Sequence, residues 1–372
     1  MLRKTICILA PIHDSHDIRI FQKEAVTLAT NGYKIIMHMK NTHAVVGINI
    51  KIYETPAYSS RFLRFVRLPI IFFRALKDNA NIYHLHNPDC LPLAFALRLL
   101  GKKVVYDIHE DFKNKIMIKH WIPKPFRKII SQFISTLEMV GARFFNATIV
   151  TELPVFKRLK GNITLLENAP ISRGPLIWRA RRASEIIKNE NLFRIIYIGV
   201  ISKERGILEM LKVLNMLNDS IPARMWLLGT FENSKIFRTA AMATGWEYVD
   251  YLGQQSAEIA YGYVIKSDVG MATIHDVGGH RHTSINKIFE YMLFGLPFIA
   301  SDFPKWREML NGVEAGYWVD PINCDQIYEH ILKIASDKTL KERLGANGKE
   351  FIVNQFNWER ESKKLLNIYK KL

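Results

Sequence analysis

The chain has 372 residues, 48% of them hydrophobic, and three scattered cysteines. It is too long for one ordinary domain, so we expect two, and no window reaches the roughly 20 uninterrupted apolar residues that a membrane-spanning helix needs. The odd number and the spacing of Cys7, Cys90 and Cys324 exclude a paired-cysteine zinc site. We therefore interpret the cysteines as reduced core residues of a cytosolic protein. The N-terminal residues resemble a first strand more than a signal peptide.

The net charge of +17 lies in the first half of the chain. Residues 1–182 hold 29 Lys and Arg against 12 Asp and Glu, whereas residues 183–372 hold 23 of each. This imbalance favours a two-domain division and an anionic partner for the first half, such as nucleic acid, an acidic membrane or a phosphorylated substrate. A purely solubilising role of the excess charge is the alternative. The sequence carries no nucleic-acid-binding motif, so we expect no nucleic-acid partner.

Predicted strands and helices alternate through the first half, which is the pattern of a doubly wound α/β sheet. Strands are predicted at 5–11, 33–39, 82–86, 104–108, 147–151 and 163–166, and helices at 19–30, 61–77, 92–100 and 121–145. Arg61, Arg64 and Arg67 repeat every three residues among apolar side chains. This repeat suits either an interfacial helix on anionic lipid or an ordinary surface helix.

Ionisable side chains follow three of these strands, at the carboxyl ends where doubly wound sheets bind ligands. They are His13, Asp14, His16, Asp17 and Arg19 after the first strand, His86 and Asp89 after the third, and Asp107, His109 and Glu110 after the fourth. We therefore expect a ligand near this edge of the sheet. Asp17 also fits a helix cap, and the histidines and carboxylates could ligate a metal, although they lack the helical spacing of a metal motif.

The second half repeats the alternation after the Pro- and Gly-containing segment ENAPISRGP. Strands are predicted at 193–198, 224–229, 248–250, 268–272 and 298–300, and helices at 207–217, from 256, and at 285–294, 322–352 and 358–372. The helix 285–294 follows a Gly- and His-rich loop, with Thr283 or Ser284 as N-cap, and places Lys287 and Glu290 on one face. Its N-terminus and lysine suit a phosphate, and Glu290 could accept from vicinal hydroxyls. The alternative is an amphipathic helix with a solvated Lys and Glu.

Four segments together resemble family-4 retaining glycosyltransferases of the GT-B fold. They are HDIRIFQKEAVTLATNGY, YHLHNPDCLP followed by VVYDIHEDF, YIGVISKERGI, and SINKIFEYMLFGLPFIASDFPKWREM with GYWVDP. The resemblance covers essentially the full chain and implies an α/β protein of two Rossmann-like, doubly wound domains facing each other across a cleft. Residues 1–172 would bind the acceptor, 173–190 would be a linker and 191–357 would bind the nucleotide sugar, with the last helix, 358–372, packed back on the first domain.

The resemblance also implies roles for single residues. Glu290 matches the second glutamate of the family's E-x7-E motif and would bind the ribose, whereas His282 stands where the first glutamate is expected. Gly199 matches the glycine of a strand-end turn, and because Val200 replaces the usual arginine, Arg205 and Lys287 would supply the charge for the diphosphate. Ser284 and Asn286 complete the expected donor-binding residues. His109 matches a histidine near the transferred sugar and forms the expected catalytic set with Asp17 and Glu110. The acceptor or sugar side would comprise His13, Asp14, His16, Arg19, His86 and Asp89.

The resemblance implies retaining transfer from a UDP- or GDP-sugar to a saccharide or lipid-linked saccharide acceptor, in surface polysaccharide or glycan assembly. We expect no metal ligands, no cofactor, and a cytoplasmic protein whose basic first half contacts the inner membrane face. One alternative is a sugar-nucleotide epimerase or hydrolase on the same fold, which needs no acceptor. Another is a non-enzymatic binder of polyanions or membranes.

Overall fold

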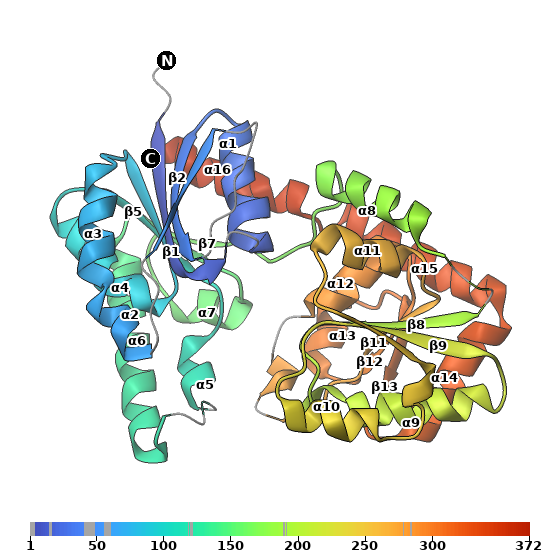
Figure 1. Cartoon of the computed structure of the whole chain (residues 1–372). Helices are drawn as coiled ribbons and strands as arrows, with labels where there is room; N and C mark the ends of the chain where they lie inside the picture. Colours follow the sequence, from blue (N-terminus) through green and yellow to red (C-terminus); the bar gives the residue numbers. More distant parts are fainter. Residues whose placement is uncertain are drawn as a thin grey trace. The chain divides into compact units, whose positions relative to one another are not determined.

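The computed structural model describes residues 4–14, 17–40, 49–55, 61–117, 119, 122–188, 190, 192–277, 279–282 and 285–372. The chain forms two compact α/β units (Figure 1). Unit 1 comprises Met1–Asn168 and Arg360–Leu372, and unit 2 comprises Ala169–Glu359. The chain therefore passes between the units twice, the second time within the last helix, α16 (Trp358–Lys371). Within the described part of the chain, no helix combines the length and apolarity needed to cross a bilayer.

Unit 1 is built on a parallel sheet whose described strands follow the order β3-β2-β1-β4-β5-β6-β7. The strands are β1 (Thr5–Asp14), β2 (Lys34–Lys40), β3 (Ile50–Glu54), β4 (Ile82–His86), β5 (Lys103–Ile108), β6 (Ala147–Val150) and β7 (Ile163–Leu165). The strand order reverses between β1 and β4. Such a switch point is where doubly wound sheets bind their ligands, at the carboxyl ends of the strands.

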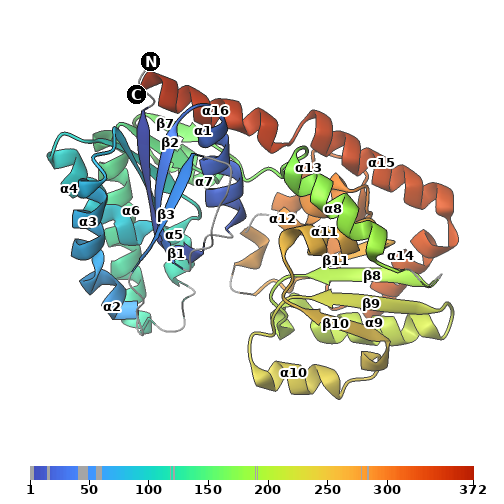
Figure 2. The same ribbon diagram turned by 45° about the horizontal axis from the view of Figure 1, so that its top comes forward.

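Alternation along β4 sends its side chains to opposite faces of this sheet. Tyr83 and Leu85 pack into an apolar core with residues of α3, α4 and α6, whereas His84 meets the other face, where it contacts Glu24 and Tyr369. A π-helix (Ile18–Ala25), α1 and the end of α16 lie on that second face (Figures 1 and 2). The helices of the unit are α1 (Val26–Thr30), α2 (Arg61–Val66), α3 (Leu68–Lys77), α4 (Leu91–Leu99), α5 (Phe112–Met117), α6 (Lys124–Phe144) and α7 (Leu153–Arg158).

Unit 2 repeats the same topology with the strand order β10-β9-β8-β11-β12-β13, again all parallel. The strands are β8 (Phe193–Ile198), β9 (Ala223–Leu228), β10 (Val249–Gly253), β11 (Val269–Ala272), β12 (Phe298–Ser301) and β13 (Gly316–Val319). Its switch point lies between β8 and β11. One apolar cluster joins the sheet to α9 and α14, and a second joins the opposite face to α11, α12 and α13. The helices are α8 (Pro175–Ile186), α9 (Ile207–Asn218), α10 (Ser234–Ala241), α11 (Ala257–Ile265), α12 (Asn286–Leu293), α13 (Pro304–Leu310), α14 (Cys324–Ser336) and α15 (Lys338–Asn354).

Most predicted elements are found in the structure, with four differences. The helix predicted at 19–30 begins as the π-helix and continues as α1 only from Val26. The single helix predicted at 322–352 is wrong: it is two helices, because Asp337 ends α14 and its side chain accepts from Leu340 N–H as the N-cap of α15. The helix predicted at 61–77 divides at Arg67, just before Pro69. Within 173–190, expected as a linker, α8 buries Leu176 and Ala180 against Tyr261 of α11.

Candidate functional site

The first candidate site lies at the carboxyl end of β8 in unit 2. Gly199 follows this strand with a φ of 135°, which a residue with a side chain rarely adopts. A Cβ atom on Gly199 would lie 2.8 Å from both Cε and Nζ of Lys287 and 3.7 Å from Nη1 of Arg205. The absence of a side chain at Gly199 therefore leaves room for two cationic groups beside the bare backbone of the turn.

The position of Arg205 is fixed by the turn that leads into α9. Arg205 ends a short 3-10 helix, Lys203–Arg205, and Gly206 follows with a left-handed φ of 76°. A Cβ atom on Gly206 would lie 2.3 Å from the carbonyl oxygen of Thr273, so the turn packs directly on the segment that follows β11. A side chain at Gly199 or at Gly206 would thus clash with neighbouring atoms, which explains why both positions are glycine.

Lys287 reaches the same place from the first turn of α12. Its Nζ lies 4.9 Å from the centre of the Tyr197 ring. Burial and then the charge of Arg205 lower the pKa of Lys287 to about 7, while Glu290 acts in the opposite direction. Two cations that repel each other in a partly desolvated place favour an anionic ligand.

Glu290 lies one turn further along α12, and its carboxylate is bonded to a tyrosine of α11. The buried Tyr261 donates a hydrogen bond from its hydroxyl to Oε1 of Glu290 at 3.1 Å. His282 and Asn286 are exposed before and at the start of the helix. The predicted N-caps, Thr283 and Ser284, lie outside the described residues. Helix α12 begins at Asn286, and Ile285, in the N-cap position, makes no side-chain capping bond.

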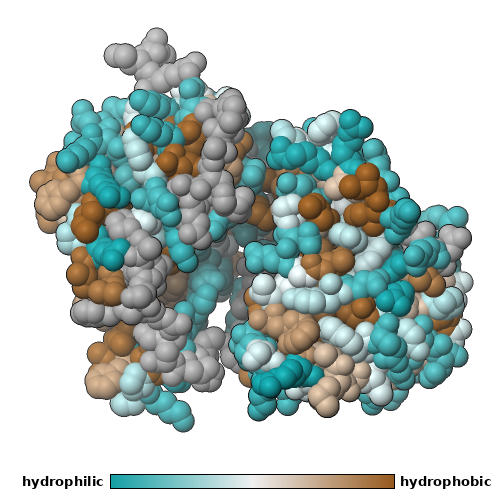
Figure 3. All heavy atoms as spheres, in the orientation of Figure 1, coloured by the Kyte–Doolittle hydropathy of each residue, from teal (hydrophilic) through white to brown (hydrophobic). Residues whose placement is uncertain are grey.

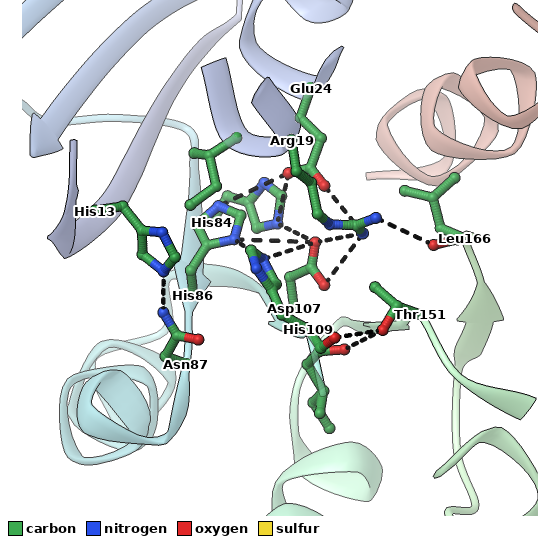
Figure 4. A network of polar contacts seen from close by, with 12 residues as sticks. His13, Arg19, Glu24, His84, His86, Asn87, Asp107, His109, Thr151 and Leu166 are labelled. Atoms are coloured by element: carbon green, nitrogen blue, oxygen red, sulfur yellow. Dashed lines mark hydrogen bonds and ion pairs between the residues drawn. The ribbon is translucent and has the colours of Figure 1, made fainter. Parts of the chain in front are cut away.

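The second candidate site lies at the switch point of unit 1, where β1 and β4 end (Figure 4). His13 Nδ1 lies 2.9 Å from Oδ2 of Asp17, and Asn87 donates from Nδ2 to His13 Nε2 at 2.5 Å. Asp17 also caps the π-helix by accepting from Ile20 N–H at 2.8 Å. Burial alone would raise the pKa of Asp17, but the bond to His13, the charge of His13 and the Ile20 N–H together lower it to about 2. Asp17 is therefore ionised throughout the physiological pH range.

Behind this pair, Arg19 holds two buried carboxylates in the interior of unit 1. Its Nη2 lies 3.0 Å from Oδ2 of Asp107 and 3.1 Å from Oε1 of Glu24, and Nη1 donates to the Leu166 carbonyl at 3.3 Å. Burial, reinforced by the charge of Asp107, raises the pKa of Glu24 well above its ordinary value. Burial alone would raise the pKa of Asp107 as well, but Arg19 and the neighbouring histidines lower it to about 2. Of the two carboxyls, Asp107 therefore gives up its proton more readily and is ionised at neutral pH.

Three histidines lie against these carboxylates in uncharged form. His86 Nδ1 is 2.8 Å from His109 Nε2, and Thr151 donates to the His109 carbonyl at 2.6 Å. Burial lowers the pKa of His109 to about 3 and that of His84 to about 4, in each case against the attraction of Asp107, and it lowers the pKa of His86 well below its ordinary value. Neutral imidazoles act here as hydrogen-bond partners and not as cations.

Comparison with known proteins identifies the class of enzyme. Residues 179–351 match the family described as "Glycosyl transferases group 1". An uncharacterized glycosyltransferase of Methanocaldococcus jannaschii is 20% identical over 350 residues, which cover 87% of this chain and 85% of the relative. The protein is a glycosyltransferase of the GT-B fold.

Solved structures agree with this fold along the whole glycosyltransferase. Sucrose-phosphate synthase from Thermosynechococcus elongatus superposes with a TM-score of 0.75 at 17% identity, covering 99% of each chain. Anabaena HepE, solved in complex with UDP-glucose, superposes with a TM-score of 0.71 at 12% identity, covering 99% of this chain and 100% of HepE. At such low identity these likenesses concern the fold alone.

The structure of the glycosyltransferase brings some of the predicted residues together and separates others. In unit 2 it gathers Gly199, Arg205, Lys287 and Glu290 around the β8 turn. In unit 1, His13, Asp17 and His109 are the partly exposed members of one group, with 22%, 24% and 13% of their side chains exposed. Glu110, predicted to be catalytic, forms an ion pair with Lys115 near the surface.

The remaining predicted residues of unit 1 lie in different surroundings. His86 and Arg19 are buried in the interior, and Arg19, expected on the acceptor or sugar side, has only 6% of its surface exposed. Asp89 lies in a short 3-10 helix, Pro88–Cys90, and Asp14 ends β1. His16 lies outside the described residues.

Sequence reasoning missed three interior members of the glycosyltransferase's polar network, Glu24, His84 and Tyr369. The spacing of His84 and His86 on one strand was a usable signal, because residues two apart in a strand share a face. Glu24 and Tyr369 carried no such signal. The first depends on the π-helical turn, and the second comes from the far end of the chain.

Proposed function

We propose that this glycosyltransferase moves a sugar from a UDP- or GDP-sugar to a saccharide or lipid-linked saccharide acceptor, with retention at the anomeric carbon. The observation that carries the proposal is the convergence of Lys287 and Arg205 on the glycine turn after β8. This arrangement suits a diphosphate, since phosphate oxygens could accept from both cations and lie against the bare backbone of Gly199. HepE, a protein of the same fold, has been solved with UDP and with UDP-glucose.

The chemical step would depend on the departure of the nucleoside diphosphate. Negative charge develops on its phosphate as the glycosidic bond breaks, and Arg205 and Lys287 would stabilise that charge. Glu290, oriented by Tyr261, would accept hydrogen bonds from the ribose hydroxyls. No carboxylate of the sequence is marked out as a nucleophile, so we favour attack from the face on which the leaving group departs, assisted by its phosphate.

Unit 1 would bind and orient the acceptor. His13, Asp17 and His109 form its partly exposed polar group, and the ionised Asp17 can accept a hydrogen bond from an acceptor or sugar hydroxyl. Because His109 is neutral, it would position a hydroxyl of the transferred sugar through a hydrogen bond. It would not repel a nearby cation. Substitution of Asp17 by Asn should lower kcat while leaving the affinity for the donor nucleotide unchanged.

A membrane-bound acceptor is supported by the surface of α6. Phe126, Ile129 and Phe133 are exposed by 56%, 66% and 63% and lie on one face of this helix, next to the exposed Lys124 and Lys128. Hydrophobic side chains stand among hydrophilic ones on the visible surface of unit 1 (Figure 3). We infer that this face contacts an anionic membrane. Flotation with liposomes that contain acidic lipid should recover the wild type, and Phe126→Ser with Phe133→Ser should abolish recovery; no flotation of the wild type would contradict the inference.

Calorimetric titration with UDP, GDP and ADP and their sugars tests the donor site. We expect Arg205→Ala and Glu290→Ala each to weaken nucleotide binding by ~10–100-fold, as the loss of a charge-assisted hydrogen bond implies. Arg343→Ala is the matched control, because it removes an exposed cation of the same unit whose ion pair, at 2.9 Å, is with Glu314. Unchanged binding in both site variants would overturn the assignment. Donor sugar that is epimerised or hydrolysed without an acceptor would instead support the alternative enzyme class.

A further inference from the structure

Four fully buried side chains converge in the interior of unit 1, and the two histidines among them each keep one nitrogen without a partner in the described part of the chain. Glu24 of the π-helix, His84 and His86 of β4 and Asp107 of β5 each offer one atom, and these four atoms all lie within 4.8 Å of one another. Among the described residues, neither Nε2 of His84 nor Nε2 of His86 has a hydrogen-bond partner. An unpaired buried nitrogen is costly and uncommon in native proteins, so two at one point indicate something that binds there.

The separations between these atoms match a metal better than a direct bond or a water molecule. His84 Nε2 lies 3.9 Å from Oε2 of Glu24 and 3.9 Å from Oδ2 of Asp107, and His86 Nε2 lies 3.8 Å from Oε2 of Glu24. Such distances are too long for hydrogen bonds. Two partners of a tetrahedral water would be ~4.6 Å apart, whereas tetrahedral donors at ~2.0–2.2 Å from a metal are ~3.3–3.6 Å apart. His86 approaches Oδ2 of Asp107 through Nδ1, at 3.9 Å, and the four offered atoms lie within 4.8 Å of one another, so the side chains must move closer together to hold a cation.

The other nitrogen of each histidine is already held, as in metal sites where an outer partner fixes the ring. His84 Nδ1 lies 2.7 Å from the hydroxyl of Tyr369, and His86 Nδ1 lies 2.8 Å from Nε2 of His109. The ring of His84 thereby presents Nε2 to Glu24 and Asp107, and the ring of His86 presents Nε2 to Glu24 (Figure 4). Arg19 contacts the two carboxylates from a different side than the imidazoles do and holds them in place.

A second buried cluster of the same unit provides a contrast. Cys7, His38 and Asp78 also gather within reach of a common point. There, however, His38 Nε2 bonds directly to Oδ2 of Asp78 at 2.7 Å, and the Cys7 thiol donates to the same carboxylate. These donor atoms satisfy one another, whereas the Nε2 atoms of His84 and His86 do not.

We propose that Glu24, His84, His86 and Asp107 bind one divalent transition-metal ion, for which two imidazoles and two carboxylates are a suitable donor set. The ion is structural: all four ligands are fully buried, and it joins the π-helix, β4 and β5 and, through Tyr369, the last helix. This proposal departs from the expectation, drawn from the sequence, that the chain has no metal ligands. It stands independently of the proposed function, because its readout is metal content.

The test uses the full-length protein. Elemental analysis after gel filtration should find about one equivalent of a transition metal, or one equivalent after chelator treatment and addition of Zn²⁺, and Zn²⁺ should raise the Tm of the chelated protein by ~5 °C or more. Co²⁺ should produce the intense visible absorption of a tetrahedral site. His84→Gln and His86→Gln should each lose the metal, and the control His330→Gln, a half-buried histidine of unit 2 stacked on Tyr317, should keep it.

Tyr369→Phe covers the case in which the ligand variants do not fold, since it retains all four ligands. Loss of the outer partner of His84 should weaken Zn²⁺ binding by ~10–100-fold. The proposal would be overturned by wild-type protein that takes up less than about a tenth of an equivalent of Zn²⁺ or that shows no Co²⁺ absorption. In that case a proton shared between Glu24 and Asp107, and not a metal ion, would hold the cluster together. Equal metal content in His84→Gln and His330→Gln would overturn it too.

Discussion

The hydroxyl of Tyr369 lies 2.7 Å from Nδ1 of His84, and both residues are fully buried. The bond joins the last helix to β4 across 285 positions of sequence. Tyr33 meets the ring of Tyr369 edge-on at 5.9 Å between ring centres. The end of α16 is therefore an integral part of unit 1 and not an appended tail.

Tyr369→Phe should lower the stability of unit 1. The substitution leaves His84 Nδ1 buried without its partner, which costs about 1–2 kcal/mol and corresponds to a fall in Tm of ~2–8 °C for a unit of this size. Differential scanning calorimetry of the metal-free protein measures the change. Tyr328→Phe is the control, because its hydroxyl bonds to Ser220 at the exposed surface; equal Tm values for the two variants would show that the buried bond contributes nothing.

Gly199→Ala should weaken nucleotide binding by ~10-fold or more, because the new Cβ would force Lys287 away from the turn. The control is Gly312→Ala. Gly312 also has a positive φ, 79°, but no atom lies within 4 Å of the Cβ position. Both variants suffer backbone strain, and only the first displaces a cation. Calorimetric titration with UDP or GDP should separate them, and equal affinities would show that Lys287 does not contact the nucleotide.

Nucleotide binding should take up a proton above neutral pH. In the free protein the lowered pKa of Lys287, about 7, leaves its amine mostly neutral at pH 8. A bound diphosphate favours the charged form and raises that pKa, so the complex gains close to one proton at pH 8 and little at pH 6. Titrations in buffers of different ionisation enthalpy measure this uptake. Lys287→Met should eliminate it; uptake that persists in the variant would assign the proton to another group.

The stability of unit 1 should depend on pH through Glu138. Burial, opposed by Arg158 at 2.9 Å, raises the pKa of Glu138 to about 7. Because the folded-state pKa lies above the unfolded value, the protonated acid favours the folded state. This contribution is complete below about pH 4.5 and is lost as the pH rises through 7, amounting to at most ~3 kcal/mol. The Tm difference between the wild type and Glu138→Gln, followed from pH 5 to 8, should therefore change by several degrees; a constant difference would contradict the shifted pKa.

Local patterns predicted most of the fold. Short runs such as 82–86 and 193–198 are strands in the structure, and the two α/β halves are confirmed. The GT-B fold and glycosyltransferase activity, which the family resemblance implied, are confirmed as well. Hydrophobic periodicity and glycine turns are properties of neighbouring residues, which the sequence displays directly. The division of 322–352 at Asp337 was missed because an aspartate inside a helical pattern is equally consistent with a helix cap and with a solvated residue on the helix surface.

By itself the sequence determined the alternation of strands and helices, the glycine turn at Gly199 and the candidates Arg205, Lys287 and Glu290, because each depends on local spacing. Only the tertiary structure decided what surrounds them. The π-helix places Arg19 beside Glu24, five positions on, where the expected α-helix would turn them apart. Parallel pairing of β4 with β5 sets His86 opposite Asp107, and α16 brings Tyr369 to His84. Burial then neutralises the histidines and lowers the pKa of Lys287, because the cost of a charge depends on how much water the fold has removed from around it.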